Sequence, residues 1–334
     1  ASDVYKRQDP SSFWGKLAAD NFKWKRKWDS VYSSNFETAE IKWFEGALLN
    51  ITENCIYRHL INSGNKTAII FEPNDSKSKS EHISYNELHK RVNKFANVLK
   101  AKGISKGDRI CIYLPMIPEL AISVLACARI GAIHNVVFAG FSSSALSARI
   151  NDCGCKMVIT SDGGYRGSKK NDLKCIVDEA LKDCSCVEKV LVVNRTSCDV
   201  DMHSERDEWL EDLLKVASDD CEAIVINSED PLFILYTSGS TGKPKGMVHS
   251  SAGYMVYTAY TFKNIFNFQE NDIYWCTADI GWITGHSYII YGPLLNGATT
   301  VMYEGIPSFP DYGRFWKIIE KHKINQFYLS LIHI

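Results

Sequence analysis

The feature that most constrains the fold is a regular alternation of strand-like and helix-like patterns between residues 109 and 193. Short apolar runs predict strands, and longer stretches with apolar residues three and four positions apart predict helices. The predicted strands are 109–114, 133–138, 156–160 and 187–193, and the predicted helices are 119–129, 144–152 and 173–181. Strands that alternate with helices form βαβ units, so we expect an α/β fold of layered, parallel-rich sheets flanked by helices.

Patterns typical of strands and helices are also found before residue 109 and after residue 193. A capping box at Ser84–Glu87 begins a helix that Gly103 closes, and the polar stretch 74–82 before it predicts a surface loop. Further strands are predicted at 232–235, 273–276, 299–303 and 327–328, with helices at 252–262, 289–295 and 315–322. Ligands of such sheets bind outside the carboxyl ends of the strands, which is where we look for a site.

A glycine-rich loop follows the predicted strand at 232–235. Residues 236–246 read Tyr-Thr-Ser-Gly-Ser-Thr-Gly-Lys-Pro-Lys-Gly. Glycines let backbone N–H groups approach a ligand, and hydroxyl and ammonium groups donate to anionic oxygens. We therefore predict a polyphosphate-binding loop formed by Thr237, Ser238, Gly239, Ser240, Thr241, Gly242, Lys243 and Lys245. Pro244 stands where a P-loop ATPase carries a metal-binding Ser or Thr, so the loop is of another type; a Gly/Ser-rich linker is the alternative.

Composition excludes several classes of protein. The 334 residues carry a net charge of -1, so no bulk basicity points to nucleic acid. The most apolar long stretch, 121–141, holds Arg129 and His134 near its centre and fits a helix followed by a strand better than a membrane span. The eleven cysteines form no paired C-x-x-C motif, so a zinc site is disfavoured and we assign no metal ligand in this chain. Reduced, buried thiols indicate a reducing compartment, which we take to be the cytoplasm.

The beginning of the chain differs from the rest. Residues 1–8 show no periodicity, and we expect them to be non-native or unstructured. The segment that follows is rich in tryptophan, with Trp14, Trp24, Trp28 and Trp43. Side chains of this size bury large areas, so we predict a helical extension that packs on the main body.

Two motifs together carry a family resemblance. The loop at 236–246 and the stretch Asp-Ile-Gly-Trp-Ile-Thr-Gly-His-Ser-Tyr at 279–288 resemble the adenylate-forming (AMP-binding) superfamily, and within it the acetyl-CoA synthetase (acetate–CoA ligase) family. Supporting stretches lie at 138–143, 291–294, 297–300 and 304–307. The resemblance runs from about residue 10 to 328 and implies the fold of the large N-terminal domain of these enzymes, here incomplete.

The resemblance implies a two-step reaction. Acetate attacks the α-phosphate of ATP to give acetyl-AMP and pyrophosphate, and the thiol of CoA then displaces AMP to give acetyl-CoA. ATP, CoA and Mg²⁺ are the implied cofactors, and the loop at 237–245 would hold the β- and γ-phosphates. No general base is assigned because acetate is already ionised at neutral pH. The implied partners are small-molecule substrates, with no nucleic acid and no membrane, and the oligomeric state stays open.

Two further groups of residues are assigned by matching positions in the family. The acyl pocket would be lined by Trp282, Ile283 and Thr284, for which plain core packing is the alternative. CoA would contact Arg166, Gly167, Ser168, Lys169, Thr284 and Ser308. The assignment of Ser308 is weak because the family often carries Asn at this position. For residues 166–169, the alternative is a solvated basic turn. We expect His286 to be a core residue.

The family pattern stops after residue 328. We therefore divide the chain into the N-terminal acetyl-CoA synthetase extension at 9–68, a truncated AMP-binding domain at 69–328 and a non-native end at 329–334. The adenine and metal contacts and the catalytic residues are expected beyond residue 334, so we expect this fragment to be inactive alone and to expose apolar sheet edges.

Several other functions stay open. A propionyl- or acetoacetyl-CoA synthetase would share both motifs. A non-catalytic nucleotide- or CoA-binding module could function at this length. A P-loop ATPase is disfavoured by Pro244.

Overall fold

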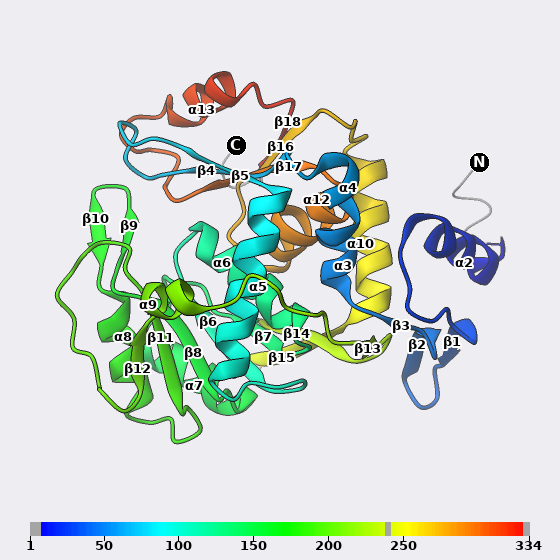
Figure 1. Ribbon diagram of the computed structural model, residues 1–334, viewed down its shortest axis with the longest axis horizontal. Helices are drawn as coiled ribbons and strands as arrows, with labels where there is room; N and C mark the ends of the chain where they lie inside the picture. Colours follow the sequence, from blue (N-terminus) through cyan, green and yellow to red (C-terminus); the bar gives the residue numbers. More distant parts are fainter. Residues whose placement is uncertain (1–7, 238–241, 330–334) are drawn as a thin grey trace.

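The computed structural model describes residues 8–237 and 242–329, and within them two sheets form the centre of the molecule (Figure 1). The larger sheet has the strand order β12-β11-β8-β6-β7-β14-β15 and is parallel except for the β14–β15 pair. Its strands are β6 (Arg109–Tyr113), β7 (Ile133–Val136), β8 (Met157–Ser161), β11 (Lys189–Val193), β12 (Asp207–Trp209), β14 (Pro231–Thr237) and β15 (Lys245–Ser250). The strands predicted at 109–114, 133–138, 156–160, 187–193 and 232–235 are thus confirmed, whereas β12 and β15 are additions.

The smaller sheet has the order β18-β16-β17-β4-β5, with β5 antiparallel to β4 and the other pairs parallel. Its strands are β4 (Thr67–Glu72), β5 (Glu81–Ser84), β16 (Ile273–Cys276), β17 (Thr299–Tyr303) and β18 (Gln326–Tyr328). The sequence analysis does not predict β4 and β5. The surface loop predicted at 74–82 needs two corrections, because β5 begins at Glu81 and the side chain of Asn74 is buried.

Helices cover both sheets, so that five layers result. Helices α5 (Tyr85–Ala101), α6 (Pro118–Arg129) and α10 (Ser251–Ile265) contribute to the core that includes residues of both sheets. Helices α7 (Ser143–Cys153) and α8 (Leu173–Leu181) cover the outer face of the larger sheet, and α13 (Arg314–His322) covers part of the outer face of the smaller one. Alternate residues of β6 pack into different cores: Ile110 and Ile112 face the inner layer, and Cys111 and Tyr113 face α7 and α8.

The N-terminal region packs on the main body, as predicted, but it is helical only in part. Its elements are α2 (Pro10–Asn21), β1 (Ser30–Asn35), β2 (Glu40–Glu45), β3 (Leu48–Leu49), α3 (Ile51–Cys55), η1 (Tyr57–His59) and α4 (Leu60–Ser63). Strands β1 and β2 form an antiparallel hairpin, so the expectation of a helical extension is wrong there. Trp14 of α2 holds the region to α10, with its ring 5.2 Å from that of Tyr260.

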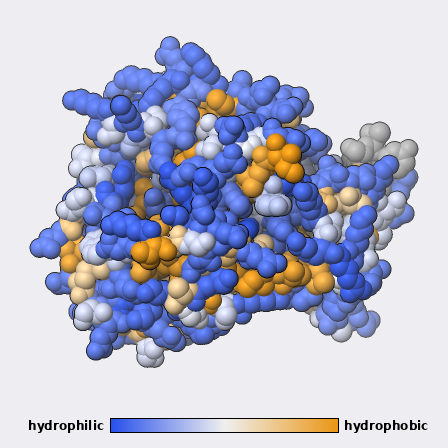
Figure 2. All heavy atoms as spheres, in the orientation of Figure 1, coloured by the Kyte–Doolittle hydropathy of each residue, from blue (hydrophilic) through white to orange (hydrophobic). Residues whose placement is uncertain are grey.

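The remaining elements are short: β9 (Gly164–Arg166), β10 (Lys169–Asn171), α9 (Leu210–Val216), β13 (Ile226–Asn227), α11 (Ile283–Gly285), η2 (His286–Tyr291) and α12 (Gly292–Leu295). The face shown in Figure 2 is mostly hydrophilic, with hydrophobic residues at the surface in separate places. Edge strand β15 exposes Met247 and Val248 by 52% and 59%. None of the helices in the described ranges is long and apolar enough to span a bilayer.

Candidate active-site pocket

One pocket of about 440 Å³ lies where the carboxyl ends of strands from both sheets meet. Strands β16 and β17 of the smaller sheet end there, and Met116 and Phe138 follow strands β6 and β7 of the larger sheet. Its walls are Met116, Phe138, Arg166, Trp275, Cys276, Thr277, Ala278, Asp279, Trp282, Thr284, Tyr303, Gly305, Ile306, Pro307, Phe315 and Tyr328. This is the place where sheets of this kind bind ligands, and its size suits a small molecule.

The turn after β16 carries the residues predicted for the acyl pocket. Trp282 and Thr284 line the pocket, whereas Ile283 is not among its walls. The side chain of Trp282 is 50% exposed and meets the ring of Phe141 edge-on at 6.5 Å. Exposures of 50% for Trp282 and 44% for Ile283 argue against plain core packing, and the role of these residues in acyl binding stays a prediction.

Asp279 shapes this turn and was not predicted from the sequence as a site residue. Its carboxylate accepts a hydrogen bond of 2.7 Å from the backbone N–H of Gly281, and its carbonyl accepts one of 3.1 Å from the N–H of Trp282. Burial raises the pKa of Asp279 to about 6, although the Gly281 bond and the charge of Arg166 act in the opposite direction. A carboxyl group in a pocket wall that titrates near neutrality marks a place where ligand chemistry can occur.

Strands β9 and β10 place the predicted CoA residues on a hairpin beside this pocket. Arg166 and Lys169 lie opposite each other in the ladder, so their side chains share one side of the hairpin. The Arg166 guanidinium lies 5.3 Å from the centre of the Phe138 ring and lines the pocket. Ser168 and Ser308 are exposed and are not among the walls of this pocket. The pocket therefore brings Arg166, Trp282 and Thr284 together.

The loop predicted to bind phosphate, residues 236–246, joins the antiparallel strands β14 and β15 at the edge of the larger sheet, which agrees with a strand-flanked loop. Thr237 ends β14 opposite Lys245, which begins β15. Gly242 has a φ of +81°, and Lys243 is exposed. Ser238, Gly239, Ser240 and Thr241 lie outside the described residues. None of the described residues of this loop lines the pocket at the meeting of the sheets.

His286 lies in the core, as predicted. It is fully buried in an aromatic stack, 4.7 Å from the ring of Phe233 and 5.4 Å from that of His134. Neither ring nitrogen of His286 has a hydrogen-bond partner within the described ranges, and burial lowers its pKa to about 4. An uncharged, stacked imidazole is a packing group rather than a proton carrier at neutral pH.

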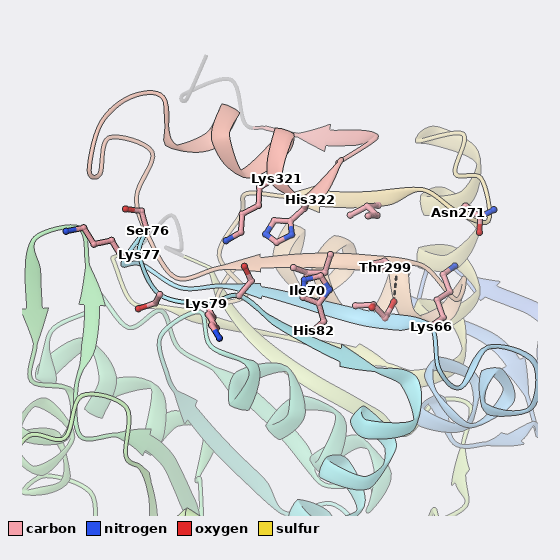
Figure 3. A pocket seen from close by; sticks show the side chains of 14 residues that line it. Lys66, Ile70, Ser76, Lys77, Lys79, His82, Asn271, Thr299, Lys321 and His322 are labelled. Carbon is pink, nitrogen blue, oxygen red and sulfur yellow. Dashed lines mark hydrogen bonds between the residues drawn. The ribbon is translucent and has the colours of Figure 1, made fainter.

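A larger hollow of about 840 Å³ lies on the outer face of the smaller sheet (Figure 3). It is lined in part by Lys66, Lys77, Lys79, Lys321 and His322. Three of these groups already have partners: Lys66 donates to the carbonyls of residues 270 and 297, and Lys321 and His322 contact Glu72. The remaining lysines belong to the exposed stretch after β4. We therefore place the site in the smaller pocket.

The residues that could bind a metal ion lie outside the candidate pocket. Within the described ranges, Asp178, His203 and Asp207 form a group of suitable spacing. Lys174 and Arg206 already pair with both carboxylates at 2.5–2.8 Å, so the negative charge of the group is compensated by the protein. All eleven cysteines are free.

Comparison with known proteins identifies relatives across almost the whole chain. The family described as AMP-binding enzyme matches residues 57–330, and the family described as acetyl-coenzyme A synthetase N-terminus matches residues 4–55. The chain is 56% identical over 325 residues to an acetyl-coenzyme A synthetase of Syntrophobacter fumaroxidans, which covers 97% of this chain and 50% of that protein. It is 53% identical over 330 residues to the acetyl-coenzyme A synthetase of Alkalilimnicola ehrlichii, which covers 98% of this chain and 51% of that protein.

The chain thus spans about half the length of the curated relatives it matches. The family match includes strands β14 and β15, the β9–β10 hairpin and the turn at 279–288. The parallel-rich, layered fold agrees with that match. The chain belongs to the AMP-binding enzyme family.

Proposed function

We propose that this chain is part of an AMP-forming acetate–CoA ligase, and that it supplies the acyl wall, the CoA hairpin and the phosphate loop of that enzyme. The observation that carries the proposal is the pocket at the meeting of the sheets, where Arg166, Trp282 and Thr284 form one wall. The relatives named acetyl-coenzyme A synthetase support acetate as the acid and CoA as the acceptor.

In the first step, the carboxylate of acetate attacks the α-phosphorus of ATP, and pyrophosphate leaves. Lys243 and Lys245, with the backbone and hydroxyl donors of the loop, would hold the β- and γ-phosphates of ATP by charge-assisted hydrogen bonds. Mg²⁺ prefers oxygen ligands, and the described residues 242–245 of this loop offer lysines instead. We therefore assign no Mg²⁺ ligand to residues 242–245.

In the second step, the thiol of CoA displaces AMP from acetyl-AMP. Arg166 and Lys169 would pair with phosphate groups of CoA, because both cations lie on one side of the β9–β10 hairpin. The thiol end would then reach the acyl group beside Trp282 and Thr284. The free thiols of the chain suit the reducing cytoplasm, where we place this reaction.

Trp282 limits the length of the acyl chain in this proposal. A bulky ring at the wall leaves room for a short chain and favours acetate over propionate or acetoacetate. One methylene in an apolar pocket changes rates by about 10- to 200-fold.

The test uses the 334-residue chain and a chimaera in which the second half of the Syntrophobacter relative continues it. The chimaera should catalyse acetate-dependent exchange of pyrophosphate into ATP and CoA-dependent release of AMP, and the chain alone should show neither. Trp282→Ala should raise the rate with propionate relative to acetate by about tenfold or more. Trp316→Ala, at an exposed tryptophan of α13, is the matched control and should leave the ratio unchanged.

Other results would select another function. A soluble, folded chimaera without acetate-dependent exchange would refute the proposal. Exchange that is faster with propionate or acetoacetate in the unaltered chimaera would favour the corresponding ligase. Micromolar binding of ATP and CoA by the chain, measured by calorimetry, with an inactive chimaera would favour a binding module.

A further inference from the structure

The tip of the β9–β10 hairpin is held by one buried amide from the other sheet. The side chain of Asn74, which follows strand β4, donates through Nδ2 to the carbonyl of Gly167 at 2.9 Å. Its Oδ1 accepts from the N–H of Gly167, also at 2.9 Å. Asn74 is only 5% exposed, so both bonds are shielded from water. The Asn74 side chain thus bonds to both the carbonyl and the N–H of Gly167, as a backbone residue of a neighbouring strand can do.

The hairpin itself leaves these two backbone groups without partners. Strand β9 ends at Arg166 and β10 begins at Lys169, so Gly167 is the first residue of a two-residue turn, with a φ of +63°. The ladder pairs Arg166 with Lys169 and does not use the N–H or the carbonyl of Gly167. An amide side chain carries a donor and an acceptor together, so Asn74 satisfies both.

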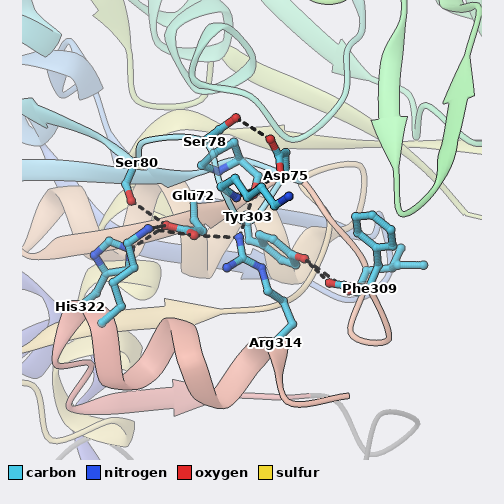
Figure 4. A network of polar contacts seen from close by, with 12 residues as sticks. Glu72, Asp75, Ser78, Ser80, Tyr303, Phe309, Arg314 and His322 are labelled. Atoms are coloured by element: carbon cyan, nitrogen blue, oxygen red, sulfur yellow. Dashed lines mark hydrogen bonds and ion pairs between the residues drawn. The ribbon is translucent and has the colours of Figure 1, made fainter. Parts of the chain in front are cut away.

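Asn74 is itself well anchored. The residue before it, Pro73, accepts a 3.0 Å hydrogen bond from Arg314 through its carbonyl. Arg314 also pairs with Glu72, the last residue of β4, in the polar network of Figure 4. The network thus fixes the backbone from which Asn74 reaches the hairpin.

Packing leaves little free space at the tip. A Cβ atom on Gly167 would lie 2.8 Å from Cδ1 of Ile306, which is a wall of the candidate pocket. At the base of the hairpin, Arg195 lies 5.5 Å from the Tyr165 ring and forms an ion pair with Glu304. The base and the tip are therefore held by different contacts, and Figure 1 shows the hairpin beside the β4–β5 connection.

From this arrangement we infer that Asn74 is a positioning residue for CoA: it holds the hairpin tip so that Arg166 stays at the pocket wall with Lys169 on the same side. The inference rests on the proposed function, because that function assigns CoA to this hairpin. Asn74 acts through Gly167 and touches no substrate itself. Holding the hairpin before CoA arrives lowers the ordering cost of binding.

The chain contains a matched control for this contact. Asn54, fully buried, makes the same two bonds to one backbone residue: it accepts from the N–H of Lys23 at 2.8 Å and donates to its carbonyl at 3.0 Å. That contact lies in the N-terminal region. Loss of either contact should lower stability, but only loss of the Asn74 contact should affect the hairpin.

The first measurement is hydrogen exchange on the 334-residue chain and on its Asn74→Ala and Asn54→Ala variants. Asn74→Ala should speed exchange in residues 164–171 by about tenfold or more and leave β11 unchanged. Asn74→Asp keeps the acceptor for the Gly167 N–H but places a carboxylate oxygen against the Gly167 carbonyl, so it should also speed exchange at the hairpin. Asn54→Ala should leave the hairpin at the unaltered rate.

The second measurement is calorimetric titration of the chimaera, and of its Asn74→Ala and Asn54→Ala variants, with CoA and with ATP. Asn74→Ala should raise the dissociation constant for CoA by about tenfold without changing that for ATP, and Asn54→Ala should change neither. Faster exchange at the hairpin with unchanged CoA affinity would overturn the positioning role. If a chimaera that is active in pyrophosphate exchange does not bind CoA, the assignment of CoA to this hairpin fails, and the hydrogen-exchange data then identify the Asn74 contact as purely structural.

Discussion

Two carboxyl groups of the smaller sheet lie in opposite environments. Glu72 ends β4 and is fully buried among Arg314, Lys321, His322 and Ser80 (Figure 4). Asp279 follows β16 in the wall of the candidate pocket, where its one hydrogen-bond donor among the described residues is the backbone N–H of Gly281. One carboxylate pairs with the cations of Arg314 and Lys321, and the other is left available to a ligand.

The pKa values follow from these surroundings. Burial acts to raise the pKa of Glu72, but the hydrogen bonds from His322, Lys321 and Ser80 outweigh it and lower the value to about 2. Burial raises the pKa of Asp279 to about 6, because a single N–H and the more distant charge of Arg166 compensate only part of the cost. The contrast separates a carboxylate that stabilises the fold from one that costs stability and can serve function.

The largest expected effect comes from breaking the Glu72 cluster. Glu72→Gln removes the charge and leaves Arg314, only 4% exposed, without its anion, so we expect the free energy of unfolding to fall by about 3 kcal/mol. Unfolding in urea measures this. The control is Glu45→Gln, whose pair with Lys42 is half exposed on both sides and should contribute little to stability. Equal effects of the two substitutions would show that the cluster is not a special stabilising element.

The fall in the free energy of unfolding caused by Glu72→Gln should depend on pH. Because the pKa of Glu72 is about 2 in the folded chain and near 4.5 when unperturbed, its contribution is present above pH 4.5 and disappears as the pH falls through 2. The difference between the unaltered chain and Glu72→Gln should therefore narrow below pH 4.5.

Asp279→Asn should raise the free energy of unfolding, by less than Glu72→Gln lowers it. Its folded pKa of about 6 lies above the unperturbed 3.8, so protonation favours the folded state, and this contribution is lost as the pH rises through 6. Asparagine keeps the acceptor for Gly281 and carries no charge. We expect Asp279→Asn to be more stable than the unaltered chain by about 1–2 kcal/mol at pH 8, with the gain absent below pH 3.8. Lower stability at pH 8 would contradict a destabilised carboxylate.

The sequence predicts much of this architecture, for reasons visible in particular elements. Helix α8 combines regular apolar spacing with a buried stripe, and β11 is apolar from Val190 to Val193, so both are predicted within two residues. The β4–β5 pair is harder to predict because four apolar residues precede a long polar stretch. The β1–β2 hairpin is mostly exposed and polar, so tryptophan content alone predicts its packing but not its strands.

The site is predicted less completely because its geometry depends on contacts between distant segments. The loops at 166–169 and 282–284 are recognised from motifs, and the structure brings Arg166 and Thr284 to one pocket. No local pattern marks Asn74 as the partner of Gly167, since the two residues lie 93 positions apart. Likewise, the Asp-Ile-Gly motif does not show that Asp279 faces the pocket with a raised pKa.

The smallest expected effect concerns the coupling between the hairpin and the Asp279 turn. Arg166 lowers the pKa of Asp279 through its charge, so Arg166→Met should raise that pKa above about 6. A double-mutant cycle with Asp279→Asn at pH 8 should give a coupling of about 0.5 kcal/mol, because the guanidinium is exposed and screened. Lys169→Met is the control, since Lys169 is absent from the pocket walls and should couple less. In 1 M salt the Arg166 coupling should disappear, and a coupling that persists there would indicate packing rather than charge as its cause.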